Sequence, residues 1–465
     1  MIHAEIFREY DIRGLAEGEL TPAFVRLLGY ACGKYFGEHG RQRVIVGRDN
    51  RLSGGRIFDD LARGLAAAGC ELLDLGVVTT PLFYFARIDR GIDAGIMITA
   101  SHNPKEFNGF KVALGAGTIY GAEIQKLYRL CLAFQNEAGS VPANGAAPSP
   151  SRYDPYPAYL AMITAKIRLG PKRLKVAVDC GNGTASLFAA EIFTRLGCEV
   201  LPLYCESDGN FPNHHPDPVS SANCRDLIAQ VRQHGADLGI GFDGDGDRLG
   251  VVDDQGRIIW GDQAMILYWR EILAQHPGAT CIVEVKCSRA LVEEVERLGG
   301  KPLFYRTGHS LIKAKMREIG ALFTGEMSGH MFFADEYYGY DDAFYAAGRL
   351  LRILSHAEPS LSQLLANVPR YPSTAETRVP CGDADKFRVV AALTARMRER
   401  YPILDVDGVR VLFPGGWGLA RASNTQPAIV ARCEGTTAAD LQEICEIMQK
   451  ELAGFPEVGP FAWEF

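Results

Sequence analysis

Ser101 lies in a short polar stretch, residues 99–104, where a hydroxyl nucleophile could act. The apolar run 94–98 before it predicts a short buried strand, and the small polar residues closed by a proline predict a turn. Open α/β sheets bind ligands at the carboxyl ends of their strands, which makes Ser101 a candidate nucleophile. A Ser/Asn turn without chemistry explains this stretch equally well when it is taken by itself.

The histidine that follows this serine does not predict a hydrolase dyad. Neighbouring loop residues usually point apart, and nucleophile–base pairs are built in space rather than in sequence. No G-x-S-x-G elbow surrounds Ser101. We therefore expect a group other than His102 to activate or assist the serine.

Three aspartates, Asp243, Asp245 and Asp247, alternate with glycines. On an extended chain this spacing places the carboxylates on one side, and the glycines let the backbone bend until they converge. Converging carboxylates repel unless a cation or protons compensate, and their hard oxygens suit Mg²⁺. A calcium loop fits poorly, because an EF-hand needs Gly and Glu where Arg248 and Asp254 stand. A solvated acidic turn is the other alternative to a magnesium site.

Two further loops have the composition of a ligand cradle. Arg421 and the hydroxyls and amides that follow it suit a phosphate. In the loop 325–330, Glu326 and Ser328 could hold the hydroxyls of a polyol. Each loop by itself is equally well a polar turn, and a lone histidine such as His330 is more often structural than catalytic.

Basic residues accompany these loops. Arg13 lies in the stretch 10–14, Lys111 lies in the stretch 108–111, and Lys286 follows the predicted strand 281–285. Taken singly, each is most simply a surface charge. A cleft that gathered them would be positive inside an acidic protein and would suit an anionic substrate.

Composition excludes several classes of protein. A net charge of −7 argues against bulk binding of nucleic acid, which rests on neutralising phosphates. No run of 18 apolar residues predicts a membrane span, and the first residues lack the apolar region of a signal peptide. The twelve cysteines contain no C-x-x-C pair, which favours reduced thiols over disulfides or a zinc site. We expect a cytoplasmic protein.

The loops that could carry chemistry need strands and helices to position them. Hydrophobic periodicity predicts where these elements lie. Strands alternate with helices over most of the chain, which predicts βαβ units and mainly parallel sheets. A Gly-, Ala-, Pro- and Ser-rich stretch at 139–151 predicts a linker or long surface loop. After residue 374 the pattern changes to shorter strands with two helices, 385–400 and 438–452. The expected strands are 44–46, 72–75, 94–98, 176–179, 238–240, 281–285, 303–305, 322–324, 376–379, 409–413, 418–421 and 428–431, with a hairpin over 251–259.

The 465 residues predict three or four domains. We expect three similar α/β domains with mixed, mainly parallel sheets and a C-terminal α+β domain. The predicted domains are 1–150 with the serine loop, 151–257 with the aspartate loop, 258–367 with the polyol loop and 368–465 with the phosphate loop.

Taken together and in this order, the four loops resemble those of the α-D-phosphohexomutase superfamily, over essentially the whole chain. The resemblance implies that these domains are arranged around a central cleft. It also implies that Ser101 carries a phosphoryl group in the active form and that a phosphoserine oxygen shares Mg²⁺ with the three aspartates. It implies the following further site residues: Arg13, His102, Lys111, Arg248 and His330 in catalysis, and Tyr10, Lys286, His309, Glu326, Ser328, Arg421, Ser423, Asn424 and Thr425 in substrate binding.

Within this superfamily the sequence resembles the bacterial phosphomannomutase/phosphoglucomutase group. Phosphoglucosamine mutases usually have Gln at the position of Met327 and a phosphate loop of the form R-x-S-G-T-E, whereas this chain has Asn424 and Gln426. The match to residues 10–14 and 47–51 also favours the dual-specificity group. A phosphoglucosamine mutase remains an alternative, as do a phosphatase and a non-catalytic phosphosugar-binding protein.

The implied reaction is reversible phosphoryl transfer between C1 and C6 of mannose or glucose phosphates through a bisphosphosugar. Mg²⁺ and glucose 1,6-bisphosphate or mannose 1,6-bisphosphate are the implied cofactor and activator. Either His330 or Lys111 could act as the general acid/base. The expected partner is a small phosphosugar, with no nucleic acid and no membrane, and the protein is expected to be a monomer, with a dimer as the alternative.

Overall fold

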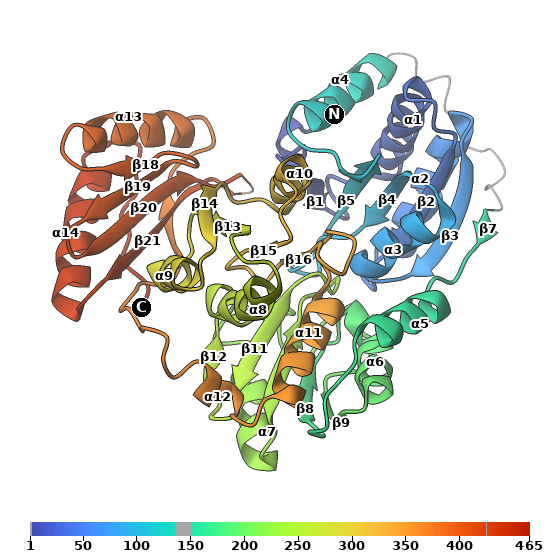
Figure 1. Ribbon diagram of the computed structural model, residues 1–465. Helices are drawn as coiled ribbons and strands as arrows, with labels where there is room; N and C mark the ends of the chain where they lie inside the picture. Colours follow the sequence, from blue (N-terminus) through green and yellow to red (C-terminus); the bar gives the residue numbers. More distant parts are fainter. Residues whose placement is uncertain (1, 136–149, 425) are drawn as a thin grey trace. The chain divides into compact units, whose positions relative to one another are not determined.

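Strands and helices alternate through most of the computed structural model, which describes residues 2–135, 150–424 and 426–465 (Figure 1). The contacts divide the chain into two units. Unit 1 comprises Met1–Ile272 and His309–Ala366, and unit 2 comprises Leu273–Gly308 and Asn367–Phe465. The chain thus forms two compact units, whereas the sequence predicts four domains. The predicted boundaries at 150, 257 and 367 stay predictions. The predicted linker at 139–151 lies almost wholly outside the described residues.

The first sheet of unit 1 has the order β1-β5-β4-β2-β3-β7, with β6 paired to β5. Strands β4, β2, β3 and β7 are parallel neighbours, whereas β5 runs antiparallel to both β1 and β4. The strands are β1 (Ile12–Leu15), β2 (Arg43–Arg48), β3 (Glu71–Val77), β4 (Ala94–Ile98), β5 (Phe107–Leu114), β6 (Gly117–Thr118) and β7 (Ser151–Arg152).

Helices cover both faces of this sheet. The core on one face joins α1 (Pro22–Glu38), α2 (Gly54–Ala67) and α4 (Ala122–Gln135) to Val44, Val46 and Ile96. Thr21 caps the start of α1, because its side chain accepts a hydrogen bond from the amide of Phe24 at 3.3 Å. On the other face, α3 (Thr80–Arg90) packs against β2 and β4.

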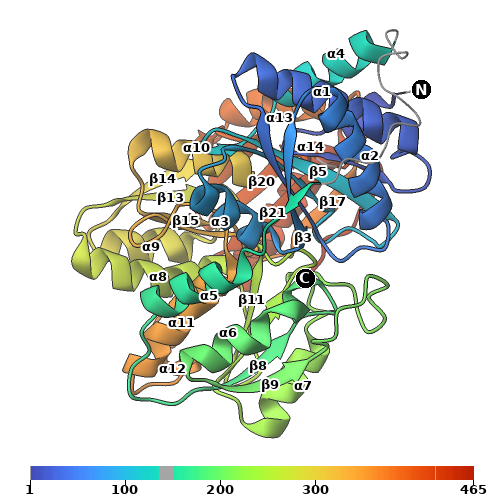
Figure 2. The ribbon, with the colours of Figure 1, turned by 90° about the vertical axis from the view of Figure 1, so that its right-hand side faces the viewer.

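The second sheet of unit 1 has the order β12-β11-β10-β8-β9. The pairs of β8 with β9 and β10 are parallel, and the pairs that join β10, β11 and β12 are antiparallel, which confirms the predicted hairpin. Helices α6 and α7 pack beside these strands (Figure 2). The elements are α5 (Tyr156–Lys166), β8 (Lys175–Asp179), α6 (Ala189–Leu196), β9 (Glu199–Leu203), α7 (Arg225–His234), β10 (Leu238–Phe242), β11 (Leu249–Asp253), β12 (Ile258–Ile259) and α8 (Gly261–Gln275).

The remaining part of unit 1 contains a short antiparallel pair, β15 (Phe323–Gly325) and β16 (Met331–Phe333), with the polyol loop between its strands. Helix α10 (His309–Ile319) precedes this pair, and α11 (Ala343–His356) and α12 (Leu361–Leu364) follow it. Asp342 caps α11 by accepting a hydrogen bond from the amide of Tyr345 at 2.9 Å.

Unit 2 has a parallel pair, β13 (Thr280–Glu284) with β14 (Lys301–Tyr305), and α9 (Arg289–Arg297) between them in the chain. Its C-terminal sheet is antiparallel throughout, in the order β17-β21-β20-β19-β18. Helices α13 and α14 share one apolar core on one face of this sheet (Figure 1). The elements are β17 (Thr377–Pro380), α13 (Lys386–Arg398), β18 (Ile403–Leu404), β19 (Val409–Phe413), β20 (Gly416–Ala422), β21 (Ala428–Gly435) and α14 (Ala438–Ala453).

Most strands fall within two residues of the positions that periodicity predicts, and the sheets are mixed as expected. Among the described residues, none of the helices combines the length and the hydropathy that a membrane span requires.

Candidate active site

The serine loop follows the fully buried strand β4 and is held from two sides. The hydroxyl of Thr99 accepts a hydrogen bond from the amide of Ser101 at 2.9 Å. The guanidinium of Arg51 donates to the carbonyl oxygens of Ser101, Asn103 and Pro104, each at 2.7 Å. Ser101 has a φ of +50°, a conformation that costs energy for a residue with a side chain and persists where its surroundings impose it.

Sequence reasoning assigned no role to Arg51 itself. Its side chain is buried and pairs with Asp49 at 3.1 Å. Burial lowers the pKa of Arg51, and the charge of Asp49 opposes this effect. Arg51 therefore serves as an internal clamp that fixes the serine loop through backbone oxygens.

The hydroxyl of Ser101 points at the aspartate loop. Its Oγ donates to Oδ2 of Asp243 at 2.6 Å, and the side chain is almost fully buried. Its Oγ also lies 3.2 Å from Nδ1 of His102. The expectation that these neighbouring side chains point apart is therefore wrong, because the left-handed turn at Ser101 brings them together. Burial and the charges of Arg248 and Arg13 lower the pKa of His102.

The three aspartates converge as predicted, and a turn rather than an extended chain brings them together. The loop turns between β10 and β11, where Gly246 has a φ of +73°. One carboxylate oxygen from each of Asp243, Asp245 and Asp247 lies within 4.8 Å of the others, and all three side chains are fully buried. Gly244 lies so close to the serine loop that a Cβ there would be 2.4 Å from the carbonyl oxygen of Ser101.

The three buried carboxylates of this loop need a cation to compensate their charge. Burial, followed by the charges of Asp245 and Asp247, raises the pKa of Asp243 well above its usual range. Burial also acts against ionisation of Asp245, but Lys111 and several hydrogen bonds outweigh it and lower its pKa. The Oδ1 atoms of Asp245 and Asp247 are buried, and no described residue forms a hydrogen bond with them. Three converging hard oxygens with unused lone pairs fit a divalent cation such as Mg²⁺.

Lys111 supplies part of the compensating charge. Its Nζ donates to Oδ2 of Asp245 at 2.8 Å and also to Oδ2 of Asp247, and its side chain is buried. Burial alone would lower the pKa of Lys111, but Asp245 and Asp247 raise it well above the usual value. Lys111 therefore stays protonated and acts as a fixed positive charge.

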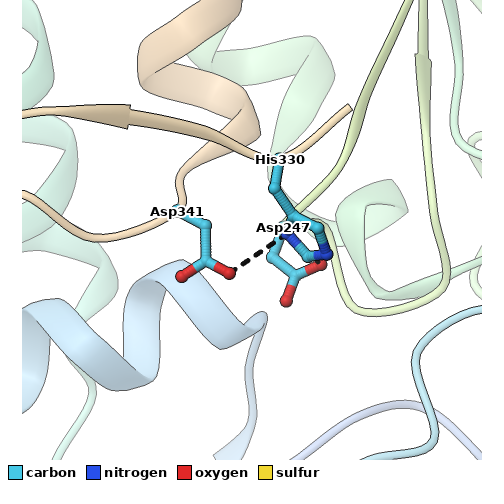
Figure 3. A group of neighbouring side chains, drawn as sticks. All are labelled: Asp247, His330 and Asp341. Atoms are coloured by element: carbon cyan, nitrogen blue, oxygen red, sulfur yellow. Dashed lines mark ion pairs between the residues drawn. The ribbon is translucent and has the colours of Figure 1, made fainter. Parts of the chain in front are cut away.

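Arg248 and His330 lie side by side at the same loop. Nε of Arg248 donates to Nε2 of His330 at 3.0 Å, so the proton of a neutral imidazole is assigned to Nδ1. That nitrogen faces two carboxylates: Oδ2 of Asp341 at 3.1 Å and Oδ1 of Asp247 at 3.5 Å (Figure 3). Asp341, which sequence reasoning missed, thus fixes the ring orientation of His330. It lies in a loop with no motif of its own, and only its pairing partners reveal it.

Other residues predicted in unit 1 surround this centre. His309 stacks on His330 with ring centroids 5.4 Å apart, and Tyr10 packs edge-on against His309 at 5.9 Å. Arg13 donates to Oδ1 of Asn103 in the serine loop at 2.6 Å and pairs with Asp11.

The polyol loop is attached to the aspartate loop by the backbone. The amide of Leu249 donates to the carbonyl oxygen of Gly329 at 3.0 Å, and that of Glu326 donates to the carbonyl oxygen of His330 at 2.9 Å. Glu326 is buried, whereas Ser328 is partly exposed. The structure thus brings the serine, aspartate and polyol loops of unit 1 together.

Unit 2 holds the other predicted binding residues. Lys286 pairs with Glu376 at 2.8 Å, and Arg421 pairs with Asp407 at 2.7 Å. Both cations help to lower the pKa of Glu376 to about 2, against the effect of its burial. The hydroxyl of Ser423 accepts from the amide of Gln426 at 3.1 Å, which shapes the loop that includes Asn424. The prediction for Thr425 lies outside the described residues.

Comparison with known proteins identifies the family to which this chain belongs. Four models of the phosphoglucomutase/phosphomannomutase family match successive parts of the chain. They are alpha/beta/alpha domain I at residues 4–136, domain II at 157–256, domain III at 260–371 and the C-terminal domain at 376–451.

Full-length relatives agree with these models. The chain is 43% identical over 449 residues to a phosphomannomutase/phosphoglucomutase of Pseudomonas putida, covering 96% of this chain and 95% of that protein. It is 42% identical over 446 residues to a phosphoglucomutase of Neisseria gonorrhoeae, covering 95% of each chain. A crystal structure of a phosphoglucomutase/phosphomannomutase family protein from Burkholderia thailandensis is 41% identical, covers 100% of both chains and superposes with a TM-score of 0.90.

The matches span all four domain models, and relatives above 40% identity align over nearly the full length. They also establish the four-domain architecture, three α/β domains and a C-terminal α+β domain, that the sequence predicted. The chain therefore belongs to the phosphoglucomutase/phosphomannomutase family and is a hexose phosphate mutase of the α-D-phosphohexomutase superfamily.

Proposed function

We propose that this mutase interconverts the 1- and 6-phosphates of glucose and mannose, with Ser101 carrying the phosphoryl group. The observation that carries the proposal is the 2.6 Å hydrogen bond from Ser101 to Asp243, inside a buried group of three carboxylates. A protein that only bound phosphosugars would need neither a buried hydroxyl on this loop nor the charge cost of three converging aspartates.

Each half-reaction exchanges one phosphorus–oxygen bond for another. The bond from phosphorus to Oγ of phosphorylated Ser101 breaks as a bond forms to the free hydroxyl of the hexose monophosphate, giving a bisphosphosugar. The hydroxyl proton passes to a base of the protein. After the intermediate turns over, its other phosphoryl group returns to Oγ of Ser101, and that base returns the proton to the sugar oxygen left behind.

The aspartates of the loop would hold Mg²⁺, which when bound neutralises charge on the transferring phosphoryl group. Lys111 and Arg248 add fixed positive charge beside the same loop. Phosphoryl transfer depends mainly on such positioning and neutralisation, so these residues should affect turnover more than substrate affinity.

His330 is the better candidate for the general acid/base. Lys111 is held in its protonated form by two carboxylates, which removes its ability to accept a proton. His330 has its Nδ1 directed at Asp341 and Asp247, and its Nε2 accepts a hydrogen bond from Arg248, so Nε2 is the position with a lone pair. Asp341 acts as a positioning residue for this imidazole.

Each unit carries residues that we assign to substrate binding. In unit 1, Glu326 and Ser328 would bind sugar hydroxyls. In unit 2, Arg421, Ser423, Asn424 and Thr425 would bind the phosphate that is not being transferred, with Lys286 beside them. A bisphosphorylated hexose that returns a phosphoryl group to Ser101 would serve as activator.

A coupled assay on glucose 1-phosphate and mannose 1-phosphate, with Mg²⁺ and a trace of glucose 1,6-bisphosphate, tests the proposal. We expect turnover of both substrates and its loss in EDTA. Release of inorganic phosphate at mutase-like rates would instead indicate a phosphatase. Turnover of glucosamine phosphate alone would indicate a phosphoglucosamine mutase.

A further inference from the structure

A cavity of about 730 Å³ opens in unit 1 without any residue of the serine, aspartate or polyol loops in its lining. Its walls come from residues around 40–43, from the second half of α3 and the turn after it, from the β5–β6 turn, from α10, and from the loop 338–340. Pockets of this size hold whole small organic molecules, so the cavity is much larger than a single phosphate requires.

The lining is strongly positive. It includes Arg41, Arg43, Arg87, Arg317 and Lys313, and Asp93 is the single acidic residue among the described residues that line it. Asp93 forms an ion pair with Arg41 at 2.7 Å. Lys313 forms an ion pair with Asp341, which is not part of the cavity lining.

Within the described part of the chain, Arg43 and Arg317 form no ion pair. Nη1 of Arg317 donates only a long hydrogen bond, 3.3 Å, to the carbonyl oxygen of Ala116. Arg317 is an exposed residue. Partial desolvation lowers the pKa of its guanidinium, and the charge of Tyr120 opposes this effect. Such a guanidinium gains most from an anion that it can bind with two parallel hydrogen bonds, above all a phosphate.

One cation of the lining, Arg87, is held in place by hydrogen bonds, whereas Arg41, Arg43 and Arg317 are exposed residues. Nη2 of Arg87 donates to the carbonyl oxygens of Asp93 and Gly115, both at 2.6 Å, and this side chain is buried. The β5–β6 turn lies directly against Arg317, because a Cβ on Gly117 would be 2.8 Å from its Nη2. The β5–β6 turn, which contacts Arg317, is therefore fixed to the end of α3 through Arg87.

Part of the lining is aromatic. Tyr84, Tyr338 and Tyr340 all contribute to it. Tyr338 keeps 42% of its surface exposed, and its ring lies parallel to that of Tyr340, with an interplanar angle of 7°. An exposed tyrosine ring supported from behind offers a stacking surface for a planar ring.

We propose that this cavity is a second ligand site, which binds a nucleoside diphosphate with its phosphates on Arg43 and Arg317 and its base on Tyr338. The size, the two guanidiniums and the aromatic part of the lining each favour such a ligand over a single small anion. The site is separate from the phosphoryl-transfer centre and does not depend on the proposed substrates.

The site is also connected to the catalytic centre through Lys313. This lysine lines the cavity, and its Nζ donates to Oδ1 of Asp341 at 2.8 Å and to the hydroxyl of Tyr84 at 3.1 Å. Asp341 in turn orients His330. Because a phosphate in the cavity competes with Asp341 for Lys313, occupancy should lower the turnover of hexose phosphates.

Isothermal titration calorimetry with ADP, GDP and UDP tests the site on the full chain, with excess Mg²⁺ and saturating glucose 1-phosphate to fill the catalytic centre. We expect at least one diphosphate to bind and the variant Arg43→Gln/Arg317→Gln to lose at least about tenfold in affinity. The control Arg129→Gln/Arg225→Gln removes two exposed arginines outside the cavity and should bind as the unmodified protein does.

Absence of binding, binding abolished by glucose 1-phosphate, or equal binding by both double variants would overturn the site. Pyrophosphate and the free nucleosides are the comparison probes. Binding of pyrophosphate as tight as that of the diphosphates would refute the aromatic part of the proposal. Unchanged turnover at saturating diphosphate would refute the connection through Lys313, and lowered turnover that the double variant no longer shows would support it.

Discussion

The hydroxyl of Ser101 and the carboxylate of Asp243 meet at 2.6 Å although 142 residues separate them in the chain. Ser101 is fixed by Arg51 through its carbonyl oxygen, and Asp243 is fixed at the end of β10. The contact places a nucleophile beside the three oxygens that would hold a divalent cation.

Ser101→Ala should abolish mutase turnover, by about 10³-fold or more, because no other described side chain replaces the phosphoryl carrier. The coupled assay measures turnover, and circular dichroism with thermal unfolding shows whether the fold is retained. Ser186→Ala is the matched control, because that hydroxyl contacts the carbonyl oxygen of Tyr204 at 3.4 Å and lies outside the serine loop. Full turnover in Ser101→Ala would refute the phosphoserine mechanism.

Lys111→Met should destabilise unit 1 by about 3–5 kcal/mol, because it leaves buried carboxylates without their partner. Lys126→Met removes a lysine whose pairing with Glu38 is exposed, and it should cost at most about 1 kcal/mol. Urea unfolding in EDTA measures both. Added Mg²⁺ should recover part of the loss in Lys111→Met, since a divalent cation at the aspartates supplies the missing charge. Equal losses in the two variants would contradict this interpretation.

Gly244→Ala should lower turnover by about 100-fold or more, because its Cβ would lie 2.4 Å from the carbonyl oxygen of Ser101 and push the two loops apart. Gly55→Ala is the control, since a Cβ there meets nothing within 4 Å and alanine favours helix α2. The coupled assay and thermal unfolding of both variants check this prediction. Normal turnover in Gly244→Ala would show that the contact does not set the geometry of the site.

Asp342 should make stability depend on pH. Burial raises the pKa of its carboxyl from 3.8 to about 6, against hydrogen bonds from Tyr337, the amide of Tyr345 and Tyr159. The folded protein therefore holds this proton more tightly than the unfolded chain does. The resulting stabilisation is present in full below about pH 4 and is lost as the pH rises through about 6, a change of about 3 kcal/mol.

Asp342→Asn should remove this component, because the amide does not titrate and its oxygen can still accept from the amide of Tyr345. Urea unfolding between pH 4 and 7.5 measures the slope, and Asp59→Asn, at an exposed position of α2, is the control. An unchanged slope in Asp342→Asn would show that this carboxyl does not contribute.

The sequence by itself determined the family, the alternation of strands and helices, and the loops that carry chemistry. These features are local: Thr21 caps α1 through its own side chain, and the apolar run of β4 ends at Ser101 wherever the rest of the chain lies. It also indicated the convergence of Asp243, Asp245 and Asp247, because their spacing is short and the intervening glycines allow the turn.

The tertiary structure alone decided which side chains meet. Arg51 and Asp341 belong to no motif with chemistry, and they act by reaching backbone oxygens or an imidazole far away in the chain. The contact of His102 with Ser101, opposite to expectation, follows from a left-handed turn that the surrounding contacts impose. The protonated state of Lys111 depends on two buried carboxylates more than 130 residues away. Charge, burial and orientation are properties of the assembled fold, and a linear pattern contains none of them.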